Sequence, residues 1–106
     1  MRVAVLASGS GTILHAMIDA SIPIALILTD RECKAENIAE INQITHQRVE
    51  RTTFGKDFDR NAYTCDIRDA LQMHDIDLVV MAGFGTILDQ PIYDVFHDRV
   101  LNTHPS

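Results

Sequence analysis

The sequence predicts an α/β fold with a mostly parallel sheet, and the pattern of its apolar residues supports this in two ways. Short runs of consecutive apolar residues, such as 23–29 and 77–82, are bounded by turn residues, as expected for strands that are covered on both faces. The segments between such runs place apolar residues at helical spacing instead. Strands and helices that alternate in this way form a parallel sheet with right-handed crossovers.

The first half of the chain predicts three strands and two helices. Residues 2–7 form a β-branched apolar run that ends in the Ser-Gly-Ser-Gly-Thr turn of residues 8–12. The helix expected after this turn has apolar residues at helical spacing, namely Ile13, Leu14, Met17 and Ile18. A second helix is expected over residues 35–42, with His46 near its end. Residues 47–52 predict a short third strand whose charges suit the edge of a sheet.

The second half predicts two further helices, each followed by a strand. No helix-breaking residue stands within residues 57–74, and the apolar residues there share one helical face: Tyr63, Ile67, Ala70 and Leu71. A buried strand at 77–82 ends in the Gly-Phe-Gly break of residues 83–85. Residues 91–97 predict a short helix that opens with proline, and residues 99–101 begin the last strand.

Composition limits the class of protein. The chain has 106 residues, of which 46% are apolar and 23% charged, and this fits one globular domain over residues 1–106. The alternation of strands and helices predicts that this domain is Rossmann-like. No run approaches the roughly 20 apolar residues of a membrane helix. The start of the chain lacks the longer apolar run of a signal peptide, so we expect a cytoplasmic protein that binds no membrane. The formal net charge of −6 argues against binding to nucleic acid, because phosphates require a basic face.

The cysteines and histidines predict no metal site. Cys33 and Cys65 lack the CxxC spacing of a zinc site, and the five histidines show neither HxxxH nor HExxH pairing. We expect buried or idle thiols and a small-molecule partner.

Three segments are expected at the carboxyl edge of the sheet, where ligands bind in folds of this kind. They are residues 8–12, 83–88 and 102–106, each of which follows a predicted strand. Their residues are therefore the candidates for binding and chemistry.

The glycine turn after the first strand predicts a phosphate site. Gly9 and Gly11 let a ligand approach the backbone closely, and the free N–H groups at the start of the following helix attract an anion. Asp30 follows the second strand as a ribose-binding acid would, although Leu14 replaces the third glycine of dinucleotide-binding proteins. A nucleotide- or phosphometabolite-binding module without catalysis is therefore one alternative, and a turn that only reverses the chain is another.

Asn102 and His104 predict chemistry at the end of the last strand. They stand two residues apart, so both side chains point the same way if the backbone stays extended, and Pro105 keeps His104 out of the helical region. A histidine passes protons near neutral pH, and an asparagine amide donates a hydrogen bond to an oxyanion. Together they indicate acyl transfer, while a pair that only caps the end of a strand is the simpler alternative.

Four blocks of the sequence resemble the glycinamide ribonucleotide formyltransferase family, in the same order. They are VAVLASGSGT at residues 3–12, the segment Arg60 to Tyr63, DLVVMAGFGTIL at 77–88 and RVLNTHPS at 99–106. The resemblance implies a truncated formyltransferase fold and the transfer of a formyl group from 10-formyltetrahydrofolate to the amino group of glycinamide ribonucleotide in purine biosynthesis. It implies these two small molecules as partners and leaves open whether the protein forms a homo-oligomer.

The resemblance also implies roles for individual residues. The turn that binds the substrate phosphate is matched by three residues: Gly11, Thr12 and Ile13. Arg60 and Asn102 match residues of the folate site, whose lining also includes Gly85, Thr86, Ile87 and Leu88. Asn102 and His104 match the catalytic pair, in which Asn102 stabilises the tetrahedral oxyanion and His104 transfers the proton.

Two sister activities share the Asn-x-His signature, namely formyl transfer to methionyl-tRNA and hydrolysis of formylfolate. The Ser-Gly-Ser-Gly-Thr turn favours the ribonucleotide enzyme over both. The acidic net charge also argues against tRNA.

The chain departs from this family at three places. The family carries an asparagine where Ile13 stands and Met-Arg where Gly85-Thr86 stands. It also continues past His104 through more sheet to a late aspartate that pairs with the catalytic histidine. We therefore expect residues 1–106 to be an incomplete fragment with little or no activity alone.

Overall fold

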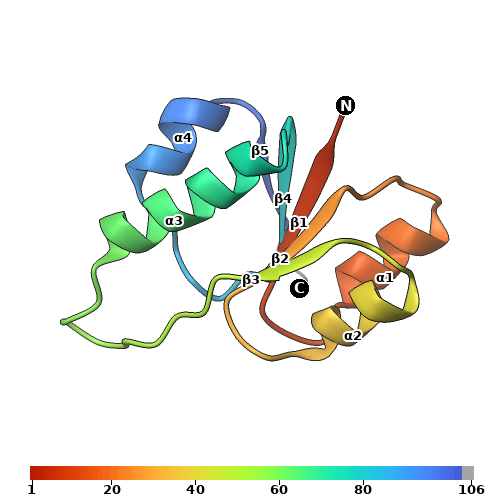
Figure 1. Ribbon diagram of the computed structural model, residues 1–106, viewed down its shortest axis with the longest axis horizontal. Coiled ribbons are helices and arrows are strands. Elements are labelled where there is room, and N and C mark those ends of the chain that lie inside the picture. The colour runs from red at the N-terminus through yellow and green to blue at the C-terminus, as the bar shows by residue number, and fades with distance from the viewer. Residues whose placement is uncertain (104–106) are drawn as a thin grey trace.

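Figure 1 shows a computed structural model of the chain, which describes residues 1–103 as five strands and four helices in strict alternation. The elements in chain order are β1 (Val3–Ala7), α1 (Thr12–Asp19), β2 (Leu26–Thr29), α2 (Lys34–Ile41), β3 (His46–Arg48), α3 (Arg60–Met73), β4 (Leu78–Ala82), α4 (Gln90–Phe96) and β5 (Val100–Thr103). All strand pairings are parallel. The predicted α/β class and the predicted alternation are confirmed.

The order of strands in the sheet is β3-β2-β1-β4-β5, which places β1 at the centre. Ala4 of β1 pairs with Leu26 of β2 on one side and with Val79 of β4 on the other. The chain therefore winds outward from β1 to β3 and then returns through α3 to the opposite side of β1. In Figure 1, α1 and α2 lie on one face of the sheet and α3 and α4 on the other, as right-handed crossovers in opposite directions require.

Successive residues of the central strands point into two different apolar cores. Leu6 belongs to the core beneath α3 and α4, together with Ile67 and Phe96. Its neighbour Val5 belongs to the core beneath α1 and α2, together with Leu14. All five side chains are buried. Because both faces of these strands are covered, their sequences are apolar at nearly every position.

The last strand is longer than the sequence predicts. β5 continues through Thr103, because residues 101–103 keep pairing with β4 from Val80 to Ala82. Asn102 therefore lies within the strand rather than after it, directly beside Met81. β2 is shorter than predicted, because it begins at Leu26 instead of residue 23.

The third strand lies at the edge of the sheet, as predicted, but it covers His46–Arg48 rather than residues 47–52. The expectation that His46 lies near the end of the second helix is wrong. α2 stops at Ile41, because Gln43 adopts a left-handed φ of 56° that a helix cannot contain. His46 therefore opens the edge strand.

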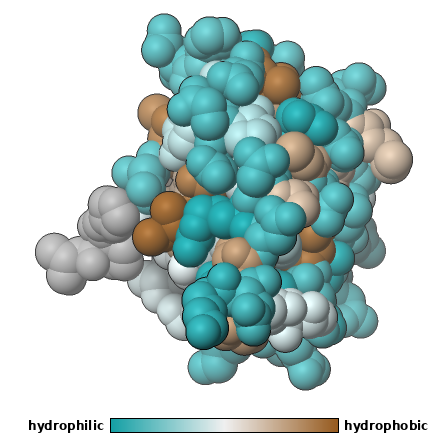
Figure 2. Space-filling model, turned by 90° about the vertical axis from the view of Figure 1, so that its left-hand side faces the viewer, coloured by the Kyte–Doolittle hydropathy of each residue, from teal (hydrophilic) through white to brown (hydrophobic). Residues whose placement is uncertain are grey.

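Figure 2 shows the face that corresponds to the left side of Figure 1, where hydrophilic residues cover most of the surface and hydrophobic residues form small separate patches. Exposed large apolar residues come from many elements, among them Ile41 of α2, Met73 of α3 and Leu101 of β5. Such scattered residues are normal on a protein surface. No helix in the described part of the chain has both the length and the apolar character needed to cross a membrane.

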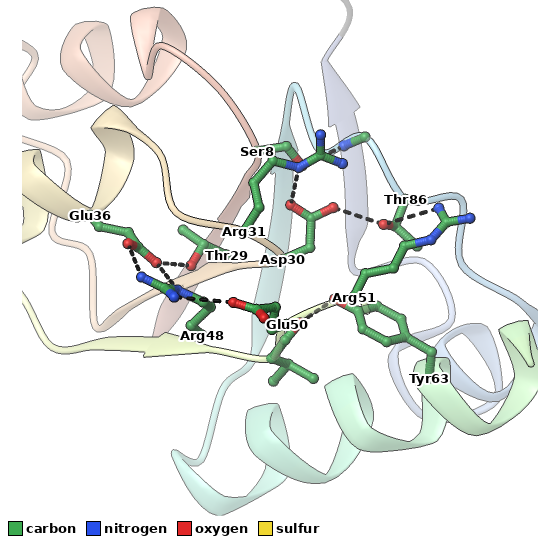
Figure 3. A network of polar contacts seen from close by, with 12 residues as sticks. Ser8, Thr29, Asp30, Arg31, Glu36, Arg48, Glu50, Arg51, Tyr63 and Thr86 are labelled. Carbon is green, nitrogen blue, oxygen red and sulfur yellow. Dashed lines mark hydrogen bonds and ion pairs between the residues drawn. The ribbon is translucent and has the colours of Figure 1, made fainter. Parts of the chain in front are cut away.

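A charged network fastens the edge strand β3 to α2 and β2 (Figure 3). Arg48 donates to both carboxylate oxygens of Glu36 over 2.7 Å, and Thr29 Oγ1 donates to the same carboxylate, also over 2.7 Å. His46 Nε2 lies 3.1 Å from Glu36 Oε2. The hydrogen bonds from Arg48, which outweigh the opposing effect of burial, lower the pKa of Glu36 to about 2.

We predict that Glu36→Gln destabilises the protein in a pH-dependent way. Because the pKa of Glu36 is lowered in the folded state, the ionised carboxylate stabilises the fold above its ordinary pKa of 4.5, and this contribution is lost as the pH falls towards about 2. In urea denaturation, the difference in free energy of unfolding between wild type and variant is expected to shrink over this range. Glu40→Gln, at an exposed position of the same helix, is the control. A difference that stays constant with pH would contradict this role of the network.

Candidate active site

The carboxyl edge of the sheet opens where the chain leaves β1 and β4 toward opposite faces. β1 continues into α1 on one face, whereas β4 continues into α4 on the other (Figure 1). Such a switch point leaves a crevice beyond the strand ends, and ligands of α/β sheets bind there. Two cavities, of about 230 and 130 Å³, are lined by the loops at this edge.

The first cavity is formed by the glycine turn and the start of α1. Its lining runs from Gly9 to Ile13 and includes Ala82 and Gly83 at the end of β4. Gly11 is the N-cap of α1 with a φ of 78°, and no side chain caps the N–H groups of the first turn. These N–H groups and the positive end of the helix dipole make the cavity suited to a phosphate.

All three residues predicted to hold the substrate phosphate, Gly11, Thr12 and Ile13, line this first cavity. Thr12 is exposed, and its hydroxyl oxygen lies 3.1 Å from that of Ser10. Ile13 is half-buried and packs against the core beneath α1 and α2. Ile13 therefore offers its backbone N–H to a ligand in place of a polar side chain. Phosphate binding itself stays a prediction.

The second cavity lies between the ends of β4 and β5 and the loop that follows β4. Its lining includes Met81, Leu88, Tyr93 and the exposed Asn102. Gly83 lines this cavity as well as the first one, so the two openings adjoin across the end of β4. The two cavities therefore share a border at the carboxyl edge of the sheet.

The stretch predicted to line the folate pocket is firmly attached to the rest of the protein (Figure 3). The Gly85 N–H donates to a serine hydroxyl at the end of β1 over 2.6 Å, and Thr86 Oγ1 donates to Asp30 Oδ2 over 2.7 Å. Leu88 is buried in the core, whereas Ile87 is exposed. Three of these four predicted residues, all except Gly85, line the second cavity. Folate binding by this stretch stays a prediction.

Arg60, which is predicted to belong to the folate site, lies beside this stretch. Its Nη1 donates to the Ile87 carbonyl over 2.5 Å, and its guanidinium carbon stands 5.2 Å from the centre of the Phe58 ring. Arg60 is the first residue of α3, whose N-cap Asp59 accepts a hydrogen bond from the Ala62 N–H. The start of α3 therefore brings Arg60 to the loop that carries the other predicted folate residues.

His104 lies outside the described residues, so its pairing with Asn102 stays a prediction. Two further residues, Ser8 and Thr64, hold the loop after β4, and the sequence patterns do not predict this role for either. Ser8 accepts a hydrogen bond from the Gly85 N–H, and Thr64 accepts one from the Asp89 N–H. Ser8 directly follows the first predicted strand, so its place at the carboxyl edge of the sheet is predictable. Thr64 lies inside α3, where no local sequence pattern indicates this contact.

Asp30 does not present its carboxylate to either cavity, as a ribose-binding acid would. It is fully buried and lines neither cavity. Its carboxylate accepts hydrogen bonds from Thr86 Oγ1 and Arg31 Nε, which a ribose would have to displace. The dinucleotide-binding alternative depends on an acidic side chain that is free to bind a ribose, and the Asp30 carboxylate is already bonded within the protein.

Five parallel strands in this order, with an open helix N-terminus at the switch point, define an α/β protein of the doubly wound class, in which ligands bind at the carboxyl edge of the sheet. The sequence profile of the Formyl transferase family matches residues 1–106. The chain therefore belongs to the formyl transferase family, and the predicted resemblance is confirmed.

Named relatives agree with this assignment. The phosphoribosylglycinamide formyltransferase of Mycobacterium tuberculosis is 36% identical over 110 residues, which cover 99% of this chain and 50% of that protein. The solved structure of the phosphoribosylglycinamide formyltransferase from Anaplasma phagocytophilum has a TM-score of 0.82 at 34% identity and matches 100% of this chain and 50% of its own. The enzyme from Coxiella burnetii has a TM-score of 0.88 at 26% identity, again over 100% of this chain and 52% of its own. The chain thus spans about half the length of these relatives.

We predict that Gly11→Ala disturbs the start of α1. Gly11 has a φ of 78°, and a Cβ atom there would stand 2.5 Å from Ile38 Cδ1, so backbone and side chain must both adjust. The free energy of unfolding, measured by urea denaturation, is expected to fall by about 1–3 kcal/mol. Gly9→Ala is the matched control, because nothing lies within 4 Å of a Cβ atom at that position. Equal losses of stability in the two variants would contradict a special requirement for glycine at position 11.

Proposed function

We propose that this chain forms the N-terminal half of a phosphoribosylglycinamide formyltransferase, which transfers a formyl group from 10-formyltetrahydrofolate to the amino group of glycinamide ribonucleotide in purine biosynthesis. The observation that carries the proposal is that Gly83 lines both cavities at the carboxyl edge. A phosphorylated amine in one cavity and a formyl donor in the other would meet where the openings adjoin. The names of similar proteins support the same reaction.

The phosphate of the ribonucleotide would bind at the N-terminus of α1. Uncapped N–H groups of the first turn supply donors there, and the exposed hydroxyl of Thr12 adds another. Gly11 lines the cavity and supplies the φ of 78° with which α1 begins. Because Ile13 has no polar side chain, recognition at this position depends on its backbone N–H.

The formylfolate would bind in the second cavity, against the loop after β4. Backbone N–H and C=O groups of residues 85–88 can fix the orientation of a flat polar ring, provided that the loop holds one shape. The hydrogen bonds of Gly85 and Thr86 to the ends of other strands favour such a shape. Tyr93 adds an aromatic wall to the same cavity, and Arg60 adds a positive charge beside the loop.

Asn102 and His104 would carry the chemistry between the two ligands. Attack of the amine nitrogen on the formyl carbon forms a carbon–nitrogen bond and places negative charge on the formyl oxygen. The Asn102 amide donates a hydrogen bond to this oxygen and stabilises the charge. When the tetrahedral species collapses, the bond from the formyl carbon to the folate N10 breaks. His104 carries the proton from the attacking amine to that leaving nitrogen.

We predict that Asn102→Ala lowers the kcat for formyl transfer by about 10²–10³-fold, as expected when one oxyanion donor is removed. The KM values for both substrates are expected to change much less, because the oxyanion exists only in the transition state. Steady-state kinetics of the full-length protein, of which residues 1–106 are the proposed N-terminal half, with glycinamide ribonucleotide and 10-formyltetrahydrofolate measures all three constants.

Gln72→Ala is the control for this experiment. Gln72 is exposed on α3 and lines a different cavity, together with Asp75 and Arg99. Wild-type kcat in Asn102→Ala would contradict the role of Asn102. Failure of the full-length wild-type protein, with residues 1–106 as its N-terminal half, to form formylglycinamide ribonucleotide would contradict the proposed function itself.

A further inference from the structure

The loop between β4 and α4, residues 83–89, carries most of the residues predicted to meet the folate, and it contains no helix or strand. Its shape therefore depends on bonds to other parts of the protein. The deepest of these bonds involves Thr86, which is fully buried. We propose that Asp30 is a positioning residue which, together with Thr86 and Arg51, clamps this loop in the shape that binds formylfolate. This inference rests on the proposed function.

The clamp holds the Thr86 hydroxyl from two sides (Figure 3). The hydroxyl donates its single hydrogen to Asp30 Oδ2 over 2.7 Å, and its oxygen accepts a longer bond from Arg51 Nη1 over 3.5 Å. One donated bond and one accepted bond fix the direction of a hydroxyl group. Rotation of the Thr86 side chain would therefore break both bonds.

Asp30 can hold the loop because of its position in the sheet. Asp30 follows β2 and Thr86 follows β4, and β1 stands between these two strands. The hydrogen bond therefore reaches across the end of β1 to a residue 56 positions away in the sequence. The Gly85 N–H adds a second attachment, to the end of β1. The loop is thus tied to two strands just before residues 87–88, which line the second cavity.

Arg51, on the other side of Thr86, is itself held in place. Its guanidinium carbon lies 3.8 Å from the centre of the Phe58 ring and 4.6 Å from that of Phe54. Its backbone N–H donates to the Asp30 carbonyl over 2.9 Å. Stacking on two rings restricts the guanidinium, and the backbone bond fixes its distance from Asp30. Both partners of Thr86 are therefore bonded to each other as well as to Thr86.

The polar character of the clamp indicates a role in geometry rather than in stability alone. Removing a carboxylate from water opposes folding, and apolar side chains of the same volume often stabilise a core equally well. Asp30 and Thr86 are nevertheless both fully buried. A hydrogen bond between them imposes a direction that apolar packing lacks. The benefit is therefore expected in folate binding, which depends on the shape of the loop.

The test compares Thr86→Val, which keeps the shape of the side chain without its hydroxyl, with Thr86→Ser, which keeps the hydroxyl. In the native protein, Thr86→Val is expected to raise the KM for 10-formyltetrahydrofolate about tenfold, as for loss of a hydrogen bond to a charged group. The KM for glycinamide ribonucleotide is expected to stay within about twofold. Thr86→Ser is expected to restore the wild-type values, and Thr45→Val, at an exposed threonine, to change neither.

Asp30→Asn separates positioning from direct contact, because Asp30 lines neither cavity. It is expected to raise the folate KM in the same direction as Thr86→Val. The double variant D30N/T86V is expected to raise it no further than T86V alone, since both changes act on one hydrogen bond. T86V removes the donor, whereas D30N replaces the charged acceptor with a neutral amide oxygen and so weakens the bond. If Thr86→Val does not fold, Asp30→Asn alone is still expected to raise the KM for 10-formyltetrahydrofolate and to leave the KM for glycinamide ribonucleotide nearly unchanged. Additive effects, or an equal rise of both KM values, would overturn the proposal.

Hydrogen exchange tests, independently of catalysis, whether the clamp holds the loop. In the ligand-free protein, the backbone amides of Gly85 and Asp89 are expected to exchange faster in Thr86→Val and in Asp30→Asn than in the wild type, while amides of β1 keep their protection. Unchanged exchange at Gly85 and Asp89 would overturn the proposal. If the wild-type protein transfers no formyl group, the proposed function fails, whereas this exchange measurement still supports or refutes the clamp.

Discussion

The pairing of β1 with β2 on one side and with β4 on the other is the constraint on which the rest of this structure depends. Because β1 is central, the crossovers on its two sides run in opposite directions and place helices on both faces of the sheet. The loops that leave β1 and β4 therefore diverge. The first cavity lies in the gap that results. The second cavity lies beside it, between the ends of β4 and β5, and the two share Gly83 at the end of β4. Strands in sequential order would send every helix to one face and leave no such gap.

The burial of polar side chains follows the same geometry. The core of the described residues is apolar except for four buried polar side chains: Thr29, Asp30, Thr64 and Thr86. Each makes a hydrogen bond, and all four lie at the end of β2, in the first turns of α3 or in the loop after β4. Buried side-chain hydrogen bonds are thus concentrated where loops need a fixed shape, at the carboxyl edge. At the opposite edge, the hydrogen bonds of Arg2 with Asp77 and with His74 lie at the exposed surface.

Local sequence patterns predict the elements well, because strands covered on both faces leave continuous apolar runs. The sequences of the edge strands β3 and β5 contain shorter apolar runs, so their bounds are predicted less well. β3 is shorter than predicted, and β5 is longer because its pairing with β4 continues into polar residues such as Asn102. The three segments of the candidate site are predictable because parallel strands end at one edge of the sheet. The bond between Asp30 and Thr86 is not, because it joins residues 56 positions apart and no local pattern reports such a pair.

A crystal structure of the native protein with glycinamide ribonucleotide and an unreactive folate analogue tests the central claim most directly, because it locates both ligands relative to Gly83. We expect phosphate oxygens within hydrogen-bond distance of the N–H groups of Thr12 and Ile13. We expect the folate ring against residues 85–88, with the position of the formyl group beside Asn102. A phosphate bound away from the start of α1, or two ligands in cavities that do not adjoin, would contradict the claim.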